Sequence, residues 1–265
     1  MATPPEPIVY EPVGRCIYCH SEGSRSEPLG KEHIVPYGLG GDWILPRASC
    51  RACAKITGEV ERYCQREMFG TLRVRMRLPS RKGHPATLPL EFIRPDGRPA
   101  RQRVPSDKVP MALIGFRFPA PGLLRGLSPA VNFEGHLIAK PVDDAAWRAR
   151  PKMERFKVGQ INTLIFARML AKIAHAYIVA NFRFDSFRPY LLDLILGRST
   201  TAPYWIGGDP HPPAPETVSA LHDVYRQDCL RAGQQYLLAA VHLFSVAGMP
   251  RYHVVVGEPH GWIRA

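Results

Sequence analysis

The sequence lacks an uninterrupted apolar run of the roughly 20 residues that a membrane-spanning helix needs. Its most apolar stretch, residues 161–182, contains Arg168, Lys172 and His175. Residues 1–12 have neither the basic segment nor the apolar segment of a secretory signal. We therefore expect a buried helix over 161–182, no membrane partner and a cytoplasmic location.

Acidic residues are scarce relative to basic ones. The chain of 265 residues has 23 Asp and Glu against 35 Lys and Arg, which gives a formal net charge of +12. A basic excess raises affinity for polyanions through counterion release. The sequence therefore favours a nucleic-acid partner, although a merely soluble basic protein has the same balance. The 27 prolines predict short elements and many turns.

Four of the six cysteines form two C-x-x-C pairs, Cys16 with Cys19 and Cys50 with Cys53. In a reducing cytosol such pairs are more often metal ligands than disulfides. Two pairs can supply the four thiolates of a tetrahedral Zn²⁺ site, and four thiolates leave no open position for water. We predict a structural zinc ion here, with a redox pair or chance spacing as the alternatives. Cys64 and Cys229 stay outside this scheme, and we expect burial for both.

The segment around these cysteines, residues 15–69, is called the cysteine module below. Extended and glycine-rich stretches precede a helical pattern in which apolar residues recur at three- and four-residue spacing. We expect a strand over Lys31–Pro36, a glycine loop over Tyr37–Asp42, a strand over Trp43–Ala48, and a helix from Cys50.

Glu32 and His33 begin an acidic-His-Ile-x-Pro run, and a Gly-Gly loop and the second C-x-x-C pair follow in order. Residues 15–66 thereby resemble the HNH endonuclease family, most closely members whose ββα-metal active site is stapled by a tetracysteine zinc. The resemblance implies that His33 is the general base that deprotonates the attacking water. It also implies that Glu32 is a ligand of a catalytic Mg²⁺ or Mn²⁺.

The chemistry of the two side chains agrees with these roles. Phosphodiester hydrolysis needs an activated water and a cation on the departing charge. Histidine has an ordinary pKa near 6.5, and a carboxylate suits a hard divalent ion. Adjacent residues of an ideal strand point to opposite faces. Glu32 and His33 can therefore share one site only if the strand ends or twists, which Pro36 and the glycine loop permit. A Glu-His pair without a catalytic role is the alternative.

Two positions depart from the family's pattern. Its second signature residue is an asparagine between the Gly-Gly loop and the second C-x-x-C pair, which braces the loop behind the histidine. This chain has no asparagine before Asn132, and Leu45 or Arg47 occupies the corresponding position. Its third signature residue completes the metal site, and here it is Ala54, which cannot bind metal. Glu61 is the better substitute because it is charged, yet it lies about 10 Å further along the helix. An ordinary helix-surface glutamate is the alternative.

A strongly basic stretch follows the cysteine module. Arg73, Arg75 and Arg77 alternate with apolar residues, so in a strand they would share one face. That face is either solvated or in contact with phosphates. The predicted nucleic-acid contacts are Arg47, Arg51, Lys55, Arg73, Arg75 and Arg77.

We place a domain boundary near Pro79–Pro85, which separates a zinc-bound, HNH-like module (1–80) from an α+β domain of unknown role (81–265). In the second part, turn signals and apolar alternation predict a hairpin, further strands and three helices. The expected elements are a hairpin over 88–104, strands over 111–118 and 132–140, helices over 161–182, 188–196 and 215–232, and a closing hairpin over 236–258.

The fold class expected is α+β, with a zinc-stapled ββα-metal module followed by a mixed antiparallel-sheet and helix domain. The function expected is that of a metal-dependent endonuclease, a hydrolase acting on nucleic acid, with DNA favoured. The first alternative is an HNH-like zinc protein that binds nucleic acid without cleaving it. A third interpretation makes the module a zinc staple for a C-terminal domain of unrelated function. The sequence does not decide between DNA and RNA, or the oligomeric state.

Overall fold

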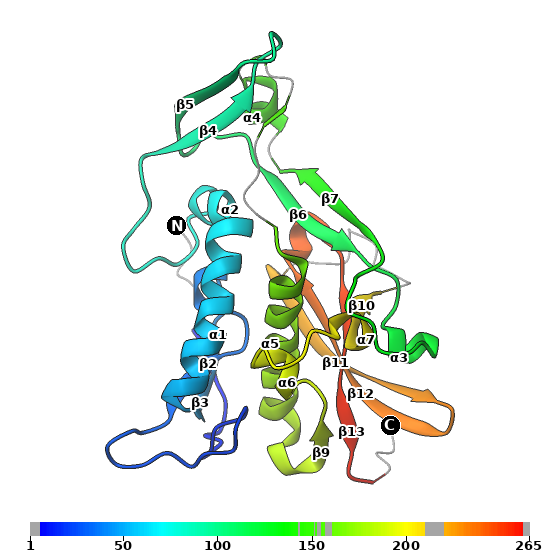
Figure 1. Ribbon diagram of the computed structural model, residues 1–265. Helices are drawn as coiled ribbons and strands as arrows, with labels where there is room; N and C mark the ends of the chain where they lie inside the picture. Colours follow the sequence, from blue (N-terminus) through cyan, green and yellow to red (C-terminus); the bar gives the residue numbers. More distant parts are fainter. Residues whose placement is uncertain are drawn as a thin grey trace.

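A long helix, α5 (Thr163–Phe182), runs through the centre of the molecule in this computed structural model (Figure 1). The structure describes residues 6–142, 144–150, 152, 155–156, 161–209 and 220–261. The cysteine module packs against one side of α5, and a five-stranded sheet packs against the other (Figure 1). The expected α+β class and the helix over 161–182 are both confirmed.

The cysteine module contains a hairpin followed by a helix, as its sequence predicts. Strand β2 (Gly30–His33) pairs antiparallel with β3 (Trp43–Ser49), and helix α1 (Arg51–Tyr63) follows directly. A two-residue strand, β1 (Ile8–Val9), pairs parallel with the other edge of β3. The order of this small sheet is therefore β1-β3-β2.

The loop between β2 and β3 depends on its glycines. It holds a short 3₁₀-helix over Tyr37–Leu39, and Gly40 then takes a left-handed conformation with φ of 92°. A side chain at Gly41 would place its Cβ only 2.0 Å from the carbonyl oxygen of Val35. Glycine has no Cβ, so this close return of the chain is available to it.

The prediction of a strand over Arg73–Arg77 is wrong. One turn of π-helix over Cys64–Met68 leads from α1 toward helix α2 (Gly70–Arg75), so the chain is helical as far as Arg75. Met76 and Arg77 then form a turn, in which Arg77 has a φ of 52°. The reason is burial: Phe69 and Leu72, three residues apart, are both less than a tenth exposed. That spacing suits a helix face, whereas the alternation of arginine with apolar residues in this stretch indicated a strand.

The second part of the chain forms the sheet beside α5. Its order is β10-β13-β12-β11, with β9 on β13, and every pairing in it is antiparallel. The strands are β9 (Phe187–Pro189), β10 (Ile206–Gly208), β11 (His222–Arg231), β12 (Gln234–Leu243) and β13 (Tyr252–Pro259). The predicted closing hairpin is confirmed as β12 and β13.

Two helix predictions in this part need correction. Residues 222–231 form a strand because β11 makes ten residue pairs with β12, and such a ladder satisfies the backbone as fully as a helix would. Residues 215–219, the start of the helix predicted over 215–232, lie outside the described residues. The helix expected over 188–196 is reduced to α6 (Leu192–Ile195), since residues 187–189 pair with β13.

The sheet of order β5-β4-β8 forms an arm that projects from the rest of the molecule (Figure 1). In this arm β4 pairs antiparallel with both β5 and β8, so the predicted hairpin over 88–104 is confirmed. The other remaining elements are short connections. The strands expected over 111–118 and 132–140 are present as β6 and β7, which pair antiparallel. These elements are β4 (Thr87–Ile93), β5 (Pro99–Pro105), β6 (Ala112–Arg117), α3 (Gly122–Arg125), β7 (His136–Pro141), α4 (Asp144–Arg148), β8 (Arg155–Phe156) and α7 (Ala202–Trp205).

One hydrophobic core joins the cysteine module to the second part. Phe69 of the module contacts Phe166 of α5 and Phe244, with ring centroids 6.4 and 5.1 Å apart. The arm has a small core of its own around Leu90 and Phe92. Helix α5 is long and apolar enough to cross a membrane, but 67% of its most apolar stretch is buried inside this core. A core helix of a folded protein has the same composition.

Candidate functional site

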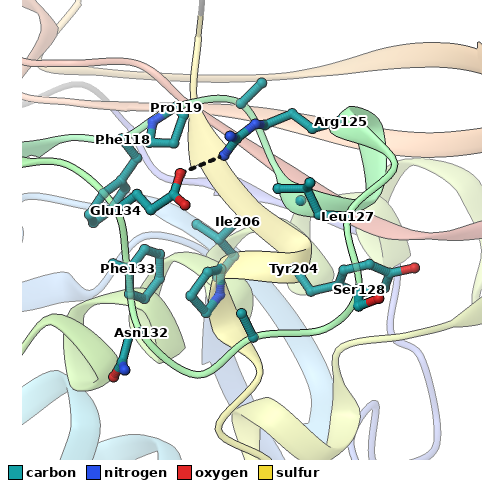
Figure 2. A pocket seen from close by; sticks show the side chains of 14 residues that line it. Phe118, Pro119, Arg125, Leu127, Ser128, Asn132, Phe133, Glu134, Tyr204 and Ile206 are labelled. Atoms are coloured by element: carbon teal, nitrogen blue, oxygen red, sulfur yellow. Dashed lines mark hydrogen bonds and ion pairs between the residues drawn. The ribbon is translucent and has the colours of Figure 1, made fainter.

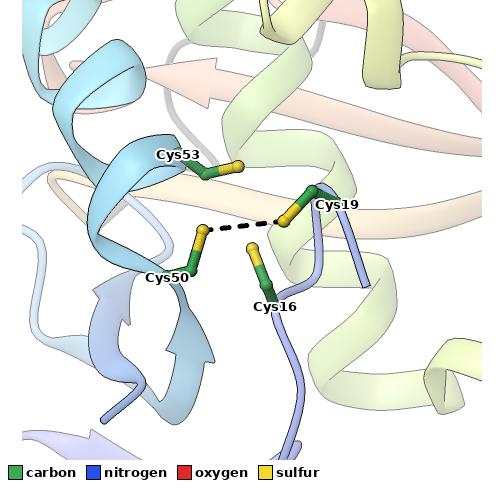
Figure 3. Close-up of side chains that lie close together, drawn as sticks. All are labelled: Cys16, Cys19, Cys50 and Cys53. Carbon is green, nitrogen blue, oxygen red and sulfur yellow. Dashed lines mark hydrogen bonds between the residues drawn. The ribbon is translucent and has the colours of Figure 1, made fainter. Parts of the chain in front are cut away.

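The four cysteines of the two C-x-x-C pairs come together at one end of α1, and their sulfur atoms point toward a common centre (Figure 3). All four Sγ atoms lie within 4.8 Å of one another, and those of Cys19 and Cys50 are 3.6 Å apart. Four sulfurs bound at about 2.3 Å to one zinc would lie about 3.8 Å apart. The cluster is therefore compatible with a structural zinc ion, and its predicted grouping is confirmed.

Local structure explains how the sulfurs converge. Cys16 and Cys19 lie on a tight turn, in which the His20 amide donates to the carbonyl oxygen of Cys16 at 2.9 Å. Cys50 is the N-cap of α1, and Cys53 lies in the first turn of that helix. The positive end of the helix dipole faces the thiolates that a metal would require. Within the part of the chain that the structure describes, this is the one group of His, Cys, Asp and Glu side chains close enough to hold a metal.

Helix α5 braces the cysteine module through polar side chains from its apolar sequence. Buried His175 donates from Nε2 to the carbonyl oxygen of Ile17, which lies between Cys16 and Cys19, at 2.8 Å. Lys172, one turn earlier, donates to the carbonyl oxygen of His33. Arg168 caps α6 through the carbonyl oxygen of Ile195, at 2.9 Å. These three polar side chains of α5 therefore face the protein interior. Lys172 and His175 hold the helix against the cysteine module, and Arg168 holds it against α6.

Glu32 lies in a buried ion cluster with Lys172 and Glu61. The Nζ atom of Lys172 is 2.8 Å from Oε1 of Glu32 and 2.7 Å from Oε1 of Glu61. The Lys172 side chain is 1% exposed, that of Glu32 7% and that of Glu61 20%. A substitute for the family's third signature residue would have to lie close to Glu32, and Glu61 does so. Between the two carboxylates, however, lies the ammonium of Lys172.

Burial and charge set the protonation of this cluster. Burial lowers the pKa of Lys172, yet the charges of Glu32 and Glu61 outweigh burial and raise it, so the ammonium persists. Burial raises the pKa of Glu32, and the nearby Glu61 charge raises it further, against the opposing effect of Lys172. Glu32 therefore holds its proton to a higher pH than an exposed glutamate does.

His33 is the last residue of β2 and is half-buried. Its ring centroid lies 5.5 Å from that of Tyr37. Burial lowers the pKa of His33, and the positive charges of Lys172, Lys31 and Arg81 lower it further. The imidazole is therefore neutral near pH 7 and has cations around it. Such a ring can accept a proton.

The predicted nucleic-acid contacts fall into two groups. Three arginines and a lysine are exposed and able to meet a ligand: Arg47, Arg51, Lys55 and Arg77. Arg73 and Arg75 are only partly exposed and bond to backbone carbonyls. Arg73 bridges the carbonyl oxygens of Gly38 and Pro79, and Arg75 donates to that of Asp107. These last two hold loops together.

Sequence reasoning missed the central position of Lys172. The available signal was a lone lysine within the most apolar stretch of the chain, because a buried charge must have a partner. It also missed Tyr18, whose hydroxyl is buried and has no hydrogen-bond partner among the described residues. Burial raises the pKa of Tyr18, and the charges of Glu32 and Glu61 add to that rise. The ring of Tyr18 lies 5.9 Å from that of His175, so this tyrosine packs against α5.

A separate pocket lies beside α3 and α7, away from the cysteine module (Figures 1 and 2). Its wall is largely apolar and includes the stacked rings of Phe118 and Phe133, 4.4 Å apart. An ion pair between Arg125 and Glu134, 3.0 Å long, spans it (Figure 2). Neither a cysteine nor a histidine lines this pocket among the described residues. It is therefore separate from the predicted nuclease centre.

Comparisons of the chain with protein-family models, with curated proteins and with solved structures gave no match.

Proposed function

We propose that this protein binds nucleic acid through an HNH-like, zinc-stapled ββα unit, and that it does so without divalent-dependent cleavage. The order β2, β3, α1, closed by the four cysteines, is the arrangement that the family resemblance implies. The net charge of +12 supports a polyanionic partner. Exposed cations on and beside this unit, among them Lys31, Arg51 and Lys55, supply phosphate contacts.

The observation that carries the absence of cleavage is the position of Lys172. A divalent ion at Glu32 would have to lie beside an ammonium that is already 2.8 Å from the Glu32 carboxylate. Two cations at that separation in a buried site repel each other strongly. Ala54 offers no ligand in compensation. A divalent ion therefore does not fit the residues present, and this proposal uses none.

Binding is measured by fluorescence anisotropy of a labelled DNA duplex over a range of KCl concentrations. Removing a single phosphate-binding cation reduces the slope of log K against log salt by about 0.9 for B-DNA. We expect Arg51→Gln to weaken binding and to lower the slope by that amount. Arg117→Gln removes an equal charge from an exposed arginine of β6, outside the cysteine module, and is the matched control. Equal effects of the two changes would contradict binding through the ββα unit.

A second candidate is the metal-dependent endonuclease, and the state of His33 favours it. A neutral, partly exposed imidazole flanked by Lys31 and Arg81 has the properties of a general base beside a phosphate. In this candidate Glu32 exchanges its partner Lys172 for Mg²⁺ or Mn²⁺ when nucleic acid binds. The buried ion pair argues against that exchange.

Plasmid nicking distinguishes the two candidates. The binding protein leaves supercoiled DNA intact with either metal ion, in the presence of enough protein to saturate the plasmid. Nicking that requires Mg²⁺ or Mn²⁺ would establish the endonuclease, if His33→Ala abolishes it. His136→Ala, which changes an exposed histidine of β7 outside the cysteine module, should leave such nicking unchanged and is the control.

A further inference from the structure

The Nζ atom of Lys172 lies at a point where four oxygen atoms converge. Two are carboxylate oxygens, Oε1 of Glu32 at 2.8 Å and Oε1 of Glu61 at 2.7 Å. Two are backbone carbonyl oxygens, that of Ile34 at 3.4 Å and that of His33. An ammonium has three N–H donors, and here they are directed at carboxylates and carbonyls only.

This oxygen set has the chemistry of a hard-cation site. Carboxylate and carbonyl oxygens are the ligands that Mg²⁺ and Ca²⁺ take in proteins. The oxygens come from β2, from the residue after it and from α1, so the site lies between the hairpin and the helix. The ammonium comes from α5, and 139 residues separate Lys172 from His33. A cation from a distant part of the chain thus fills a position built by the cysteine module.

We propose that Lys172 is a tethered cation that takes the place of a divalent ion between Glu32 and Glu61. The position therefore binds no divalent ion in the native protein and becomes a divalent-ion site once the ammonium is removed. The lysine also fixes the backbone of His33 through its carbonyl oxygen, so that it positions this residue. This inference concerns the cation of the ββα unit and does not depend on nucleic-acid binding.

The buried hydroxyl of Tyr18 is a further polar group of the cysteine module, and it has no hydrogen-bond partner among the described residues. The alternative is an ion pair that only supports packing, whose removal leaves carboxylates that bind nothing.

Manganese titration separates these two possibilities. The zinc-loaded protein is titrated with Mn²⁺, and free Mn²⁺ is followed by its electron paramagnetic resonance signal without any nucleic acid. We expect no binding by the native protein and about one Mn²⁺ per chain for Lys172→Ala, as for a single hard-cation site. Binding should disappear in the double variant Lys172→Ala with Glu32→Gln, which keeps the shape of the carboxylate and removes its charge.

Three results would overturn the proposal. The first is Mn²⁺ binding by the native protein that Glu32→Gln abolishes. The second is a folded Lys172→Ala that retains its zinc and binds no Mn²⁺. If Lys172→Ala is only marginally stable without added ions, we expect Mn²⁺ to raise its unfolding temperature. The third overturning result is an unfolding temperature that does not change with Mn²⁺. The first result would also remove the argument against divalent-dependent cleavage, whereas none of the three bears on duplex affinity, which the anisotropy measurement tests separately.

Discussion

Replacing Lys172 by methionine removes the ammonium from the buried ion cluster and keeps most of the side chain's length and apolar stem. The change leaves Glu32 and Glu61 facing each other without the cation that lies 2.8 and 2.7 Å from them. Removal of one partner from a buried ion pair costs about 3–5 kcal/mol, mainly because the remaining charge has no compensation. Small proteins unfold at a cost of about 5–15 kcal/mol, so this is a large share of the stability.

Urea unfolding followed by circular dichroism measures the effect. We expect the midpoint of Lys172→Met to fall while the m-value stays the same, since the surface exposed on unfolding is unchanged. Lys55→Met, on the exposed face of α1, is the matched control and should shift the free energy of unfolding by no more than about 0.5 kcal/mol. Adding Glu32→Gln to Lys172→Met should recover part of the stability, because it removes one uncompensated charge.

The pH dependence provides a second measure of the ion cluster. Burial already raises the pKa of Glu32 above its ordinary value of 4.5, and removal of the ammonium raises it further. The folded state then binds a proton that the unfolded state has released, so stability falls as the pH rises above 4.5. The penalty of Lys172→Met should accordingly shrink at acid pH. A penalty below about 1 kcal/mol at pH 7, or one that grows in acid, would refute the ion cluster as we describe it.

Three further predictions concern the zinc site, two histidines with lowered pKa values and a structural arginine. Cys50→Ser should lower the zinc content, measured by a colorimetric chelator assay, and destabilise the cysteine module, whereas Cys229→Ser should do neither. Burial lowers the pKa of His175 and of His222 to about 4 from 6.5, so the unfolded chain binds more protons between these values. The free energy of unfolding, measured in urea, should fall by about 3 kcal/mol per histidine as the pH drops from 6.5 to 4. A urea midpoint that stays constant over this pH range would contradict the prediction. Arg73→Lys should cost about 1–2 kcal/mol in urea unfolding, because one ammonium cannot reproduce the guanidinium's bonds to two backbone carbonyls, and an unchanged midpoint would count against that role.

The sequence by itself determined the features that depend on short-range geometry. The C-x-x-C spacing brings two thiols together within one turn, so the cysteine cluster could be predicted once both pairs were noticed. The Pro-Asp-Gly turn at Pro95–Gly97 predicted the hairpin of β4 and β5, and the apolar length of 161–182 predicted α5. Each of these rests on residues that are neighbours in the chain.

Tertiary structure alone decided the features that depend on distant partners. Strand β11 exists because β12 offers ten residue pairs to it, which its own sequence pattern did not reveal. The Arg73–Arg75 segment is helical because Phe69 and Leu72 bury against the core. In both cases packing and pairing override a local pattern that was compatible with either structure.

The interior of the candidate site is also decided by residues that are distant in the chain. Glu32 and His33 are adjacent in sequence, and the family pattern assigned them to a metal and to a water. Whether a metal has room depends on Lys172, which α5 brings to Glu32 across 140 positions of the chain. The sequence thus determined the frame of the module, because metal-ligand spacing is local. The cation between its carboxylates was decided only by folding, because a buried charge takes whichever opposite charge the packed structure places beside it.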